Sequence, residues 1–304
     1  MKTQTILITG ATSGIGRHAA LHLARAGHRV FATGRNAAAL AALRDEATGT
    51  ALETLELDVT NAASIARAKR DVDERTAGDG LDVLINNAGY GLLAPMEMVT
   101  DEDMRAQFET NVFGLMAVTR AFLPQMRARG AGKVLNVSSV GGRLTLPFFG
   151  AYNATKYAIE SMSDALRREL APFGVSVVLI EPGVIRSEFS DRSWALLAKY
   201  RTAAAPWGFV LDRADKIKSV SDASAVGPEH IARAMERAIR ARRPAARYVA
   251  PYRTKVALWL NAILPTRWFD GIMGLALGLT RRNRLAHQAG ASRSLPLGEA
   301  HHSA

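Results

Sequence analysis

Two side chains between residues 152 and 156 have the types and the spacing to move a proton. Tyr152 and Lys156 stand four positions apart, and residues at this spacing lie on the same face of a helix. An isolated tyrosine titrates at about pH 10, and a fixed cation within a few ångströms favours its phenolate. The pair could therefore donate and accept a proton near neutral pH. Surface residues also show this spacing by chance, so its interpretation depends on the rest of the sequence.

A glycine-rich segment near the N-terminus has the layout of a phosphate-binding turn. The β-branched run 5–9 predicts a buried parallel strand, and a helical pattern follows as far as Ala26. Glycines between a strand and a helix let the backbone approach a pyrophosphate, which the helix N-terminus then stabilises. The spacing is G-x-x-x-G-x-G, which differs from the dinucleotide fingerprint and also suits a plain tight connection. The residues of this turn expected to bind a cofactor are Gly10, Thr12, Ser13, Gly14, Ile15 and Gly16.

The end of the second predicted strand, 28–33, indicates which dinucleotide would bind. Gly34, Arg35 and Asn36 follow this strand, and none of them is acidic. An acidic residue here would accept hydrogen bonds from the ribose hydroxyls, whereas an arginine suits a 2′-phosphate. The sequence therefore favours NADP(H) over NAD(H), with Arg35 as the phosphate ligand.

The next two strands also end in polar residues. Strand 53–57 leads into Asp58 and Val59, and Asp58 either accepts from an adenine amino group or caps the helix that begins near Asn61. Strand 82–85 leads into a segment that suits a ligand-binding crevice or a β-turn. Its residues are Asn86, Asn87, Ala88 and Gly89.

A long helical pattern, 101–129, contains Asn111 and is expected to be interrupted near Pro124. Asparagine is mildly unfavourable within a helix, so Asn111 either faces solvent or uses its amide. The fifth strand, 133–137, ends at Ser138 and Ser139. Tyr152 lies thirteen residues after Ser139, and the helix that holds it is expected over 151–171.

The alternation of strands and helices predicts an α/β fold with a Rossmann-type doubly wound parallel sheet of about seven strands and helices on both faces. Strands 175–180 and 247–250 would complete the sheet. We expect a single NADP-binding domain over 1–251. A helical apolar and basic extension, 252–284, and a disordered tail, 285–304, would follow.

Taken in order, these residues resemble the short-chain dehydrogenase/reductase (SDR) family over residues 5–189, and more weakly as far as 251. The motifs that carry the resemblance are Thr9-Gly10 with Gly14 and Gly16, Asp58, Asn86-Asn87-Ala88-Gly89, Asn111, Ser139, Tyr152 with Lys156, and Pro182-Gly183. The resemblance implies an oxidoreductase that interconverts a carbonyl and an alcohol by hydride transfer. It also implies a homodimer or homotetramer, paired through the helical segments 101–129 and 151–171.

The resemblance also implies a role for each of four residues. Tyr152 would protonate the carbonyl oxygen in reduction and deprotonate the alcohol in oxidation. Lys156 would lower the pKa of Tyr152 and hold the nicotinamide ribose. Ser139, chosen over Ser138 for its spacing to Tyr152, would bind the substrate oxygen, and Asn111 would anchor a water that leads to Lys156. Further cofactor contacts would come from Pro182, Gly183, Val184 and Ser187, where Ser187 replaces the threonine frequent in the family.

The C-terminal third contains many apolar residues whose function the sequence leaves open. The resemblance implies a substrate lid at about 187–226. The segment 188–226 reads as irregular, and its aromatic residues either receive a bulky apolar substrate or pack the lid against the body. The apolar runs 256–264 and 268–279 fall short of the about 20 residues that span a bilayer. We expect them to cover the core or the cleft, and peripheral contact of 256–284 with a membrane is the alternative.

Composition narrows the classes of function. The chain has 304 residues, a net charge of +11 and no cysteine, which excludes thiol chemistry and disulfides. The basic charge has no nucleic-acid-binding motif beside it, so we expect a solvated basic face and no nucleic-acid partner. His18 and His22 lack a third ligand, and no metal site is expected. The N-terminus lacks the layout of a signal peptide, which favours the cytoplasm or the periphery of a membrane.

We therefore expect an NADP(H)-dependent oxidoreductase whose substrate is a lipophilic carbonyl or alcohol of the steroid, retinoid or long-chain ketone type. One alternative is a reductase of a small polar carbonyl. The other is a non-catalytic NADP(H)-binding or membrane-associated regulatory protein, which would not need Ser139, Tyr152 and Lys156 together.

Overall fold

A parallel sheet of seven strands runs through the body of the protein. The computed structural model describes residues 3–201 and 206–293, and the strand order is β3-β2-β1-β4-β5-β6-β7 with every pair parallel. The predicted doubly wound fold is confirmed. The strands are β1 (Thr5–Ile8), β2 (Arg29–Gly34), β3 (Leu52–Glu56), β4 (Val83–Asn86), β5 (Gly132–Val137), β6 (Val175–Pro182) and β7 (Arg247–Ala250).

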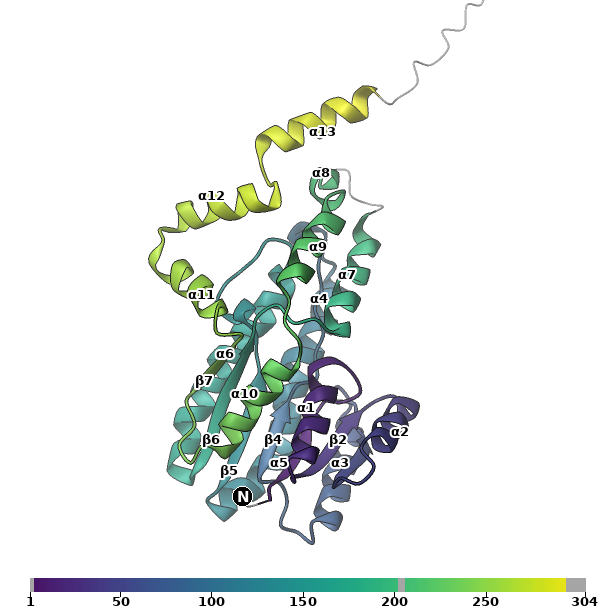
Figure 1. Cartoon of the computed structure of the whole chain (residues 1–304), viewed down its shortest axis with the longest axis vertical. Coiled ribbons are helices and arrows are strands. Elements are labelled where there is room, and N and C mark those ends of the chain that lie inside the picture. Colours follow the sequence, from purple (N-terminus) through teal and green to yellow (C-terminus); the bar gives the residue numbers. More distant parts are fainter. Residues whose placement is uncertain (1–2, 202–205, 294–304) are drawn as a thin grey trace, which may run out of the picture.

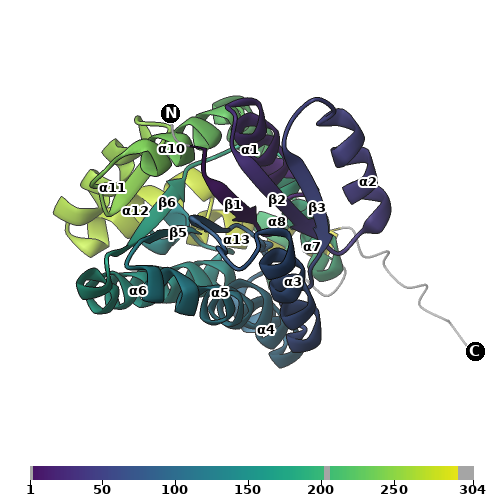
Figure 2. The same ribbon diagram turned by 90° about the horizontal axis from the view of Figure 1, so that it is seen from below.

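Helices cover both faces of the sheet (Figure 2). One face carries α1 (Gly14–Arg25), α2 (Ala37–Glu46) and α10 (Glu229–Arg240). The helices on the other face are α3 (Ala62–Arg75), α4 (Asp101–Phe108), α5 (Leu115–Arg129) and α6 (Gly150–Leu170). The strand order reverses between β1 and β4, and sheets of this kind bind ligands in a crevice at the carboxyl ends of the strands where the order reverses.

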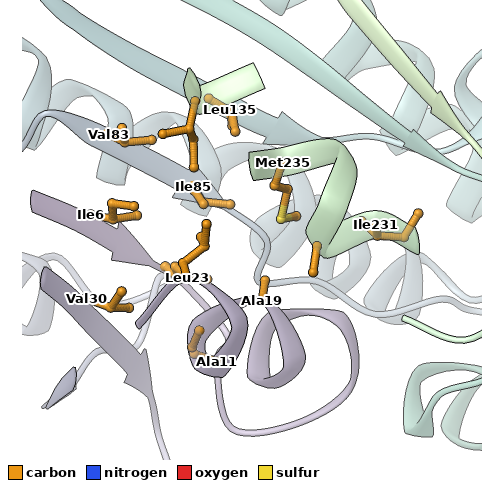
Figure 3. Close-up of a cluster of buried hydrophobic side chains, with 14 of the residues drawn as sticks. Ile6, Ala11, Ala19, Leu23, Val30, Val83, Ile85, Leu135, Ile231 and Met235 are labelled. Carbon is orange, nitrogen blue, oxygen red and sulfur yellow. The ribbon is translucent and has the colours of Figure 1, made fainter. Parts of the chain in front are cut away.

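Alternating side chains of the strands supply two hydrophobic cores. On the α1 side, Ile6 and Ile85 pack with Leu23 of α1 and Met235 of α10 (Figure 3). On the other side, the next residue of β1, Leu7, packs in the cluster that contains helix residues such as Val72 and Phe122. The short apolar strands are therefore buried on both faces, as their sequences predict.

The long helical pattern is interrupted at a different place from the one expected. Pro124 lies inside α5, which continues to Arg129. The distortion is a π-helical segment, Glu109–Gly114, between α4 and α5. A π segment widens one turn of a helix and is frequent at functional sites, and this one contains Asn111.

The predicted lid is helical, not irregular. It contains α7 (Glu188–Arg201), α8 (Gly208–Leu211) and α9 (Ala214–Ser224). Leu197 and Tyr200 of α7 are buried, three positions apart and on one face of the helix. Charged residues between such positions hide this periodicity in the sequence.

Three further helices leave the body as an arm (Figure 1). They are α11 (Thr254–Ile263), α12 (Thr266–Leu277) and α13 (Arg281–Arg293). Residues 285–293 are thus helical where the sequence predicted disorder, and the rest of the tail lies outside the described residues. No helix in the described part of the chain is long and apolar enough to cross a bilayer.

Candidate active site

Three predicted catalytic residues meet at the carboxyl ends of β5 and β6. Tyr152 and Lys156 are buried on the first turns of α6, and the Lys156 ammonium lies 5.6 Å from the centre of the Tyr152 ring. Lys156 Nζ donates to the carbonyl oxygen of Val137 on β5 at 2.8 Å. Ser139 follows β5, and its hydroxyl hydrogen-bonds the Tyr152 phenol. A hydroxyl, a phenol and an ammonium therefore share one largely dehydrated space.

Burial controls the protonation of this pair. It raises the pKa of Tyr152 to about 12, although the hydrogen bond with Ser139 acts in the opposite direction. Burial also lowers the pKa of Lys156 to about 8, although the negative charge of Glu160 raises it. The sequence predicted a lowered Tyr152 pKa, and the structure shows the reverse because loss of solvent disfavours both charged forms.

Asn111 is buried in the π segment. Of the two alternatives that the sequence left open, it therefore uses its amide and does not face solvent. Its Oδ1 accepts from Tyr90 N at 3.1 Å, and its Nδ2 donates to Tyr90 O at 2.9 Å. Nδ2 also donates to Thr155 Oγ1 at 3.1 Å, and Thr155 in turn donates to Tyr152 O at 2.7 Å. Asn111 thus supports the turn of α6 that holds Tyr152. Thr155 was not singled out from the sequence, although it lies between Tyr152 and Lys156.

The predicted glycine turn packs tightly against the loop after β4. A Cβ atom on Gly16 would lie 2.3 Å from Gly10 O and 2.4 Å from Asn87 Nδ2. Gly10 has a φ of +66°, and a Cβ there would lie 2.8 Å from Ala88 Cα. Asn87 Nδ2 donates to the carbonyl oxygens of Thr9 and Gly10 at 2.9 and 3.1 Å. These contacts require glycine at both positions and hold the loops after β1 and β4 against each other.

Thr9 was singled out from the sequence as part of the glycine motif, but its hydroxyl was given no role. Its Oγ1 accepts from the backbone N–H groups of Asn87 and Ala88 at 2.9 and 3.0 Å. Thr9 directly precedes the glycine turn, and its hydroxyl joins that turn to the loop of Asn87, Ala88 and Gly89. Gly89 itself lies against the amide of Asn111, since a Cβ there would be 2.9 Å from Asn111 Oδ1. The glycine turn and the catalytic helix are therefore connected through this loop.

The start of α1 already binds an anionic group. Gly14 N donates to Glu188 Oε2 at 2.9 Å, and a side chain on Gly14 would also contact Ser187. Free N–H groups and the helix dipole favour negative charge at this position. The turn therefore fits the pyrophosphate of a dinucleotide, with Thr12, Ser13 and Ile15 in the same turn. Glu188 was not predicted, because it lies 174 residues from Gly14.

Arg35 and Asp58 are neighbours at the ends of β2 and β3. Although burial opposes it, hydrogen bonds from Thr60 and the charge of Arg35 hold the pKa of Asp58 below its ordinary value. Asp58 Oδ1 accepts from Thr60 N and Thr60 Oγ1 at 2.9 and 2.8 Å. Asn61 caps α3 by accepting from Ser64 N, so the interpretation of Asp58 as the cap is wrong. Arg35 is exposed beside it.

The remaining residues predicted to bind the cofactor have separate surroundings. Val59 is buried against the π segment, where a Cβ on Gly114 would be 2.9 Å from its Cγ2. Pro182 ends β6, and its carbonyl oxygen is 3.5 Å from Ser139 Oγ. Gly183 N donates to Ala250 O, and Val184 faces solvent. Ser187 lies beside Gly14.

Of the two histidines one helical turn apart on α1, His22 pairs with a carboxylate. His22 Nε2 lies 2.9 Å from Glu236 Oε2. Within the described residues, no cluster of three histidine, cysteine, aspartate or glutamate side chains is placed to hold a metal ion.

The short chain dehydrogenase family model matches residues 4–196, a range that includes the glycine turn and the whole catalytic cluster. The chain belongs to the short-chain dehydrogenase family. It is accordingly an oxidoreductase of alcohols and carbonyls that binds a nicotinamide dinucleotide.

Curated members of the family resemble much of the chain. Human retinol dehydrogenase 16 is 35% identical over 90% of this chain and 88% of that protein. Human 17-beta-hydroxysteroid dehydrogenase type 1 is 36% identical over 82% of this chain and 77% of that protein. The 3-ketodihydrosphingosine reductase of Bacteroides thetaiotaomicron is 40% identical over 63% of this chain and 67% of that protein.

Solved structures of the family include complexes with both forms of the dinucleotide. A serine dehydrogenase complexed with NADP+ has a TM-score of 0.70 and 29% identity, over 81% of this chain and 93% of that one. A Burkholderia phymatum short-chain dehydrogenase in complex with NAD has a TM-score of 0.74 and 26% identity, over 86% and 93%. Family membership alone therefore leaves the choice between NAD and NADP to individual residues.

Replacing Glu188 tests the anion site at α1. Glu188→Gln should tighten the binding of the dinucleotide several-fold, because its pyrophosphate no longer competes with a carboxylate for Gly14 N–H. Fluorescence titration with NADPH and NADH would measure the effect. Glu169→Gln, an exposed substitution on α6, is the matched control and should change nothing. Weaker binding in Glu188→Gln would show that the carboxylate supports the cofactor.

The lowered pKa of Lys156 predicts a pH dependence of folding stability. Burial takes this pKa from 10.5 to about 8, so above pH 8 the unfolded chain binds the proton more tightly than the folded chain. The free energy of unfolding should therefore rise from pH 8 towards pH 10. Lys156→Met should remove this component, as measured by urea denaturation of both proteins across the range. The comparison stops near pH 10, where ionisation of Tyr152 in the unfolded chain begins to oppose it. Parallel curves for the two proteins would contradict the prediction.

Proposed function

We propose that this chain is an NADP(H)-dependent oxidoreductase that interconverts a carbonyl with a primary or secondary alcohol of a lipophilic substrate. The observation that carries the proposal is the buried cluster of Ser139, Tyr152 and Lys156 at the crevice of the sheet. A protein that only binds the dinucleotide does not need this cluster.

The cluster has the groups that such a reaction needs. The bound dinucleotide supplies or accepts the hydride, and the protein supplies geometry and proton transfer. Because burial raises the pKa of Tyr152 to about 12, its phenol carries a proton at neutral pH and can donate it to a carbonyl oxygen. The Ser139 hydroxyl holds the same oxygen. Lys156 is mostly protonated at pH 7, since its pKa is about 8, and its charge stabilises the phenolate that remains.

Asn111 and the cofactor residues complete the proposed site. Asn111 would anchor a water on the path from solvent to Lys156, and the described bonds to Thr155 hold its amide beside that turn. Gly10, Gly14 and Gly16 would bind the pyrophosphate and Asp58 the adenine. Pro182, Gly183, Val184 and Ser187 would line the nicotinamide end.

Arg35 supports the preference for NADP(H). It is an exposed cation at the end of β2 and its charge acts on Asp58. A guanidinium in this place pairs with a 2′-phosphate, and the end of β2 has no acidic residue to bind free ribose hydroxyls.

Aromatic side chains beside Tyr152 support a lipophilic substrate. Phe189 of the lid lies 5.6 Å and Phe149 lies 6.4 Å from the Tyr152 ring, centre to centre. Trp207 packs against the same hydrophobic cluster as Phe149, and its ring lies edge-on to Phe148. The three curated relatives are named for retinol, a hydroxysteroid and ketodihydrosphingosine, all of them lipophilic molecules. These aromatic side chains favour a lipophilic substrate over a small polar carbonyl.

We also propose that the protein is a homodimer or homotetramer paired through α4, α5 and α6. These helices share one face of the sheet (Figure 2). Phe113 and Tyr157, at the π segment and on α6, are exposed in the single chain, and pairing would cover them.

Replacing Tyr152 tests the chemistry. Tyr152→Phe should lower turnover of a reactive ketone by about 100- to 10,000-fold, the range for removal of a general acid, with nearly unchanged affinity for NADPH. Tyr157→Phe, on the same helix but facing solvent, is the control and should stay active. Full turnover by the Tyr152 variant would remove that residue from the mechanism.

Replacing Arg35 tests the cofactor preference. Arg35→Ala should weaken NADPH binding by about 10- to 100-fold, as expected for loss of a hydrogen-bonded charge, and should leave NADH binding little changed. Arg44→Ala, an exposed substitution on α2, is the control. Equal affinity of the wild type for the two dinucleotides would overturn the preference.

A further inference from the structure

Helix α11 presents an apolar stripe to solvent. Its exposed large side chains are Val256, Trp259, Leu260 and Ile263. This is the i, i+3, i+4, i+7 spacing that puts four side chains on one face of a helix. The one buried residue of α11 is Leu258, and its side chain packs this helix against the body. The stripe therefore has no partner among the described residues.

Helix α12 shows the same feature more strongly, because none of its residues is buried. Trp268, Ile272 and Leu275 follow the i, i+4, i+7 spacing and are 68%, 50% and 75% exposed. Figure 1 shows α12 in the arm, beyond the body of the protein. Contiguous apolar surface of this kind marks an interaction site. We call the two stripes together the apolar face of the arm.

A basic cavity lies next to the apolar face. It has a volume of about 540 Å³ and lies among α10, β7 and the start of α11, with Arg233, Arg237 and Lys255 in its wall. These three side chains are exposed and form no salt bridge within the described residues. The Lys255 ammonium lies 4.6 Å from the centre of the Tyr252 ring, which lines the same cavity. The cavity and the stripe of α11 therefore adjoin.

The charge of the arm has one sign. Residues 252–284 contain six basic residues and a single acidic one, Asp270. A second copy of this chain would bring the same positive charge against the arm and repel it. The apolar face of the arm and its positive charge together suit a partner with an apolar layer beside a negatively charged layer. An anionic lipid surface has these two layers.

We propose that the arm docks on an anionic lipid membrane, with the apolar face of α11 and α12 in the interfacial layer and the basic cavity against the negatively charged headgroups. Amphipathic helices with tryptophan on one side and basic residues nearby lie in the plane of such a surface. With 10 and 12 residues, α11 and α12 are too short to span the bilayer, so the proposed contact is with one leaflet. This inference is independent of the proposed redox reaction, because it concerns binding alone.

Co-sedimentation with lipid vesicles tests the proposal. The full chain should bind vesicles of phosphatidylcholine mixed with phosphatidylglycerol, and high salt should weaken this binding. It should bind vesicles of phosphatidylcholine alone at least tenfold more weakly. Trp268→Ser combined with Ile272→Ser should weaken binding to the mixed vesicles. Because α12 has no buried residue, this double variant should keep the fold, which circular dichroism would verify. Val220→Ser on α9, 65% exposed, is the matched apolar control and should bind like the wild type.

A charge variant tests the basic cavity separately. Arg233→Ala with Arg237→Ala should weaken binding to the mixed vesicles by about 30-fold, given the energy that each basic residue near an anionic surface contributes. Arg67→Ala with Arg70→Ala removes two exposed charges from α3, on the other face of the sheet, and should have little effect.

Two results would overturn the proposal. One is the absence of vesicle binding, and the other is equal binding to the two vesicle types, which would remove the role of the basic cavity. If the chain binds no vesicles and Trp268→Ser dissociates a dimer in sedimentation velocity, the occupant of the apolar face is a second copy of the chain.

Discussion

Burial of the Lys156 ammonium is the constraint on which the arrangement of the active site depends. A charge removed from water needs partners of its own, and Lys156 finds them in Val137 O on β5 and in the charge of Glu160, one turn further along α6. Glu160 is itself paired with Arg247 of β7 at 3.0 Å, and Arg247 also contacts Glu181 of β6 at 3.1 Å. The position of the catalytic helix therefore depends on three neighbouring strands. The depressed pKa of Lys156 and the raised pKa of Tyr152 both follow from this dehydration.

The cofactor crevice depends on a second constraint, which is that Gly10 and Gly16 have no side chain. Gly10 and Gly16 allow the loops after β1 and β4 to touch, and Asn87 and Thr9 hold them together by hydrogen bonds. Glu188, the first residue of α7, accepts from the Gly14 N–H group at the start of α1 in this structure. An anion that binds this N–H group must therefore displace the Glu188 carboxylate.

The helices of the C-terminal third show two uses of the same pattern. In α7 the apolar residues Leu197 and Tyr200 are buried and attach the lid to the body. In α12 the same kind of spacing leaves Trp268, Ile272 and Leu275 in solvent. Local sequence cannot separate these cases, because an amphipathic helix looks alike whether its apolar face meets the protein or another surface. The neighbouring elements decide which residues are covered.

The sequence by itself determined the order of the strands and of the helices that cover the sheet, the glycine turn, and the set Asn111, Ser139, Tyr152 and Lys156. These features depend on periodicity and short spacings, which act between residues close in the chain. Tertiary structure alone decided that Asn111 lies in a π segment and that Glu188 reaches Gly14. It also reversed the expected pKa shift of Tyr152. Each of these depends on burial or on contacts between distant segments, and desolvation is a property of the surroundings that no local pattern contains.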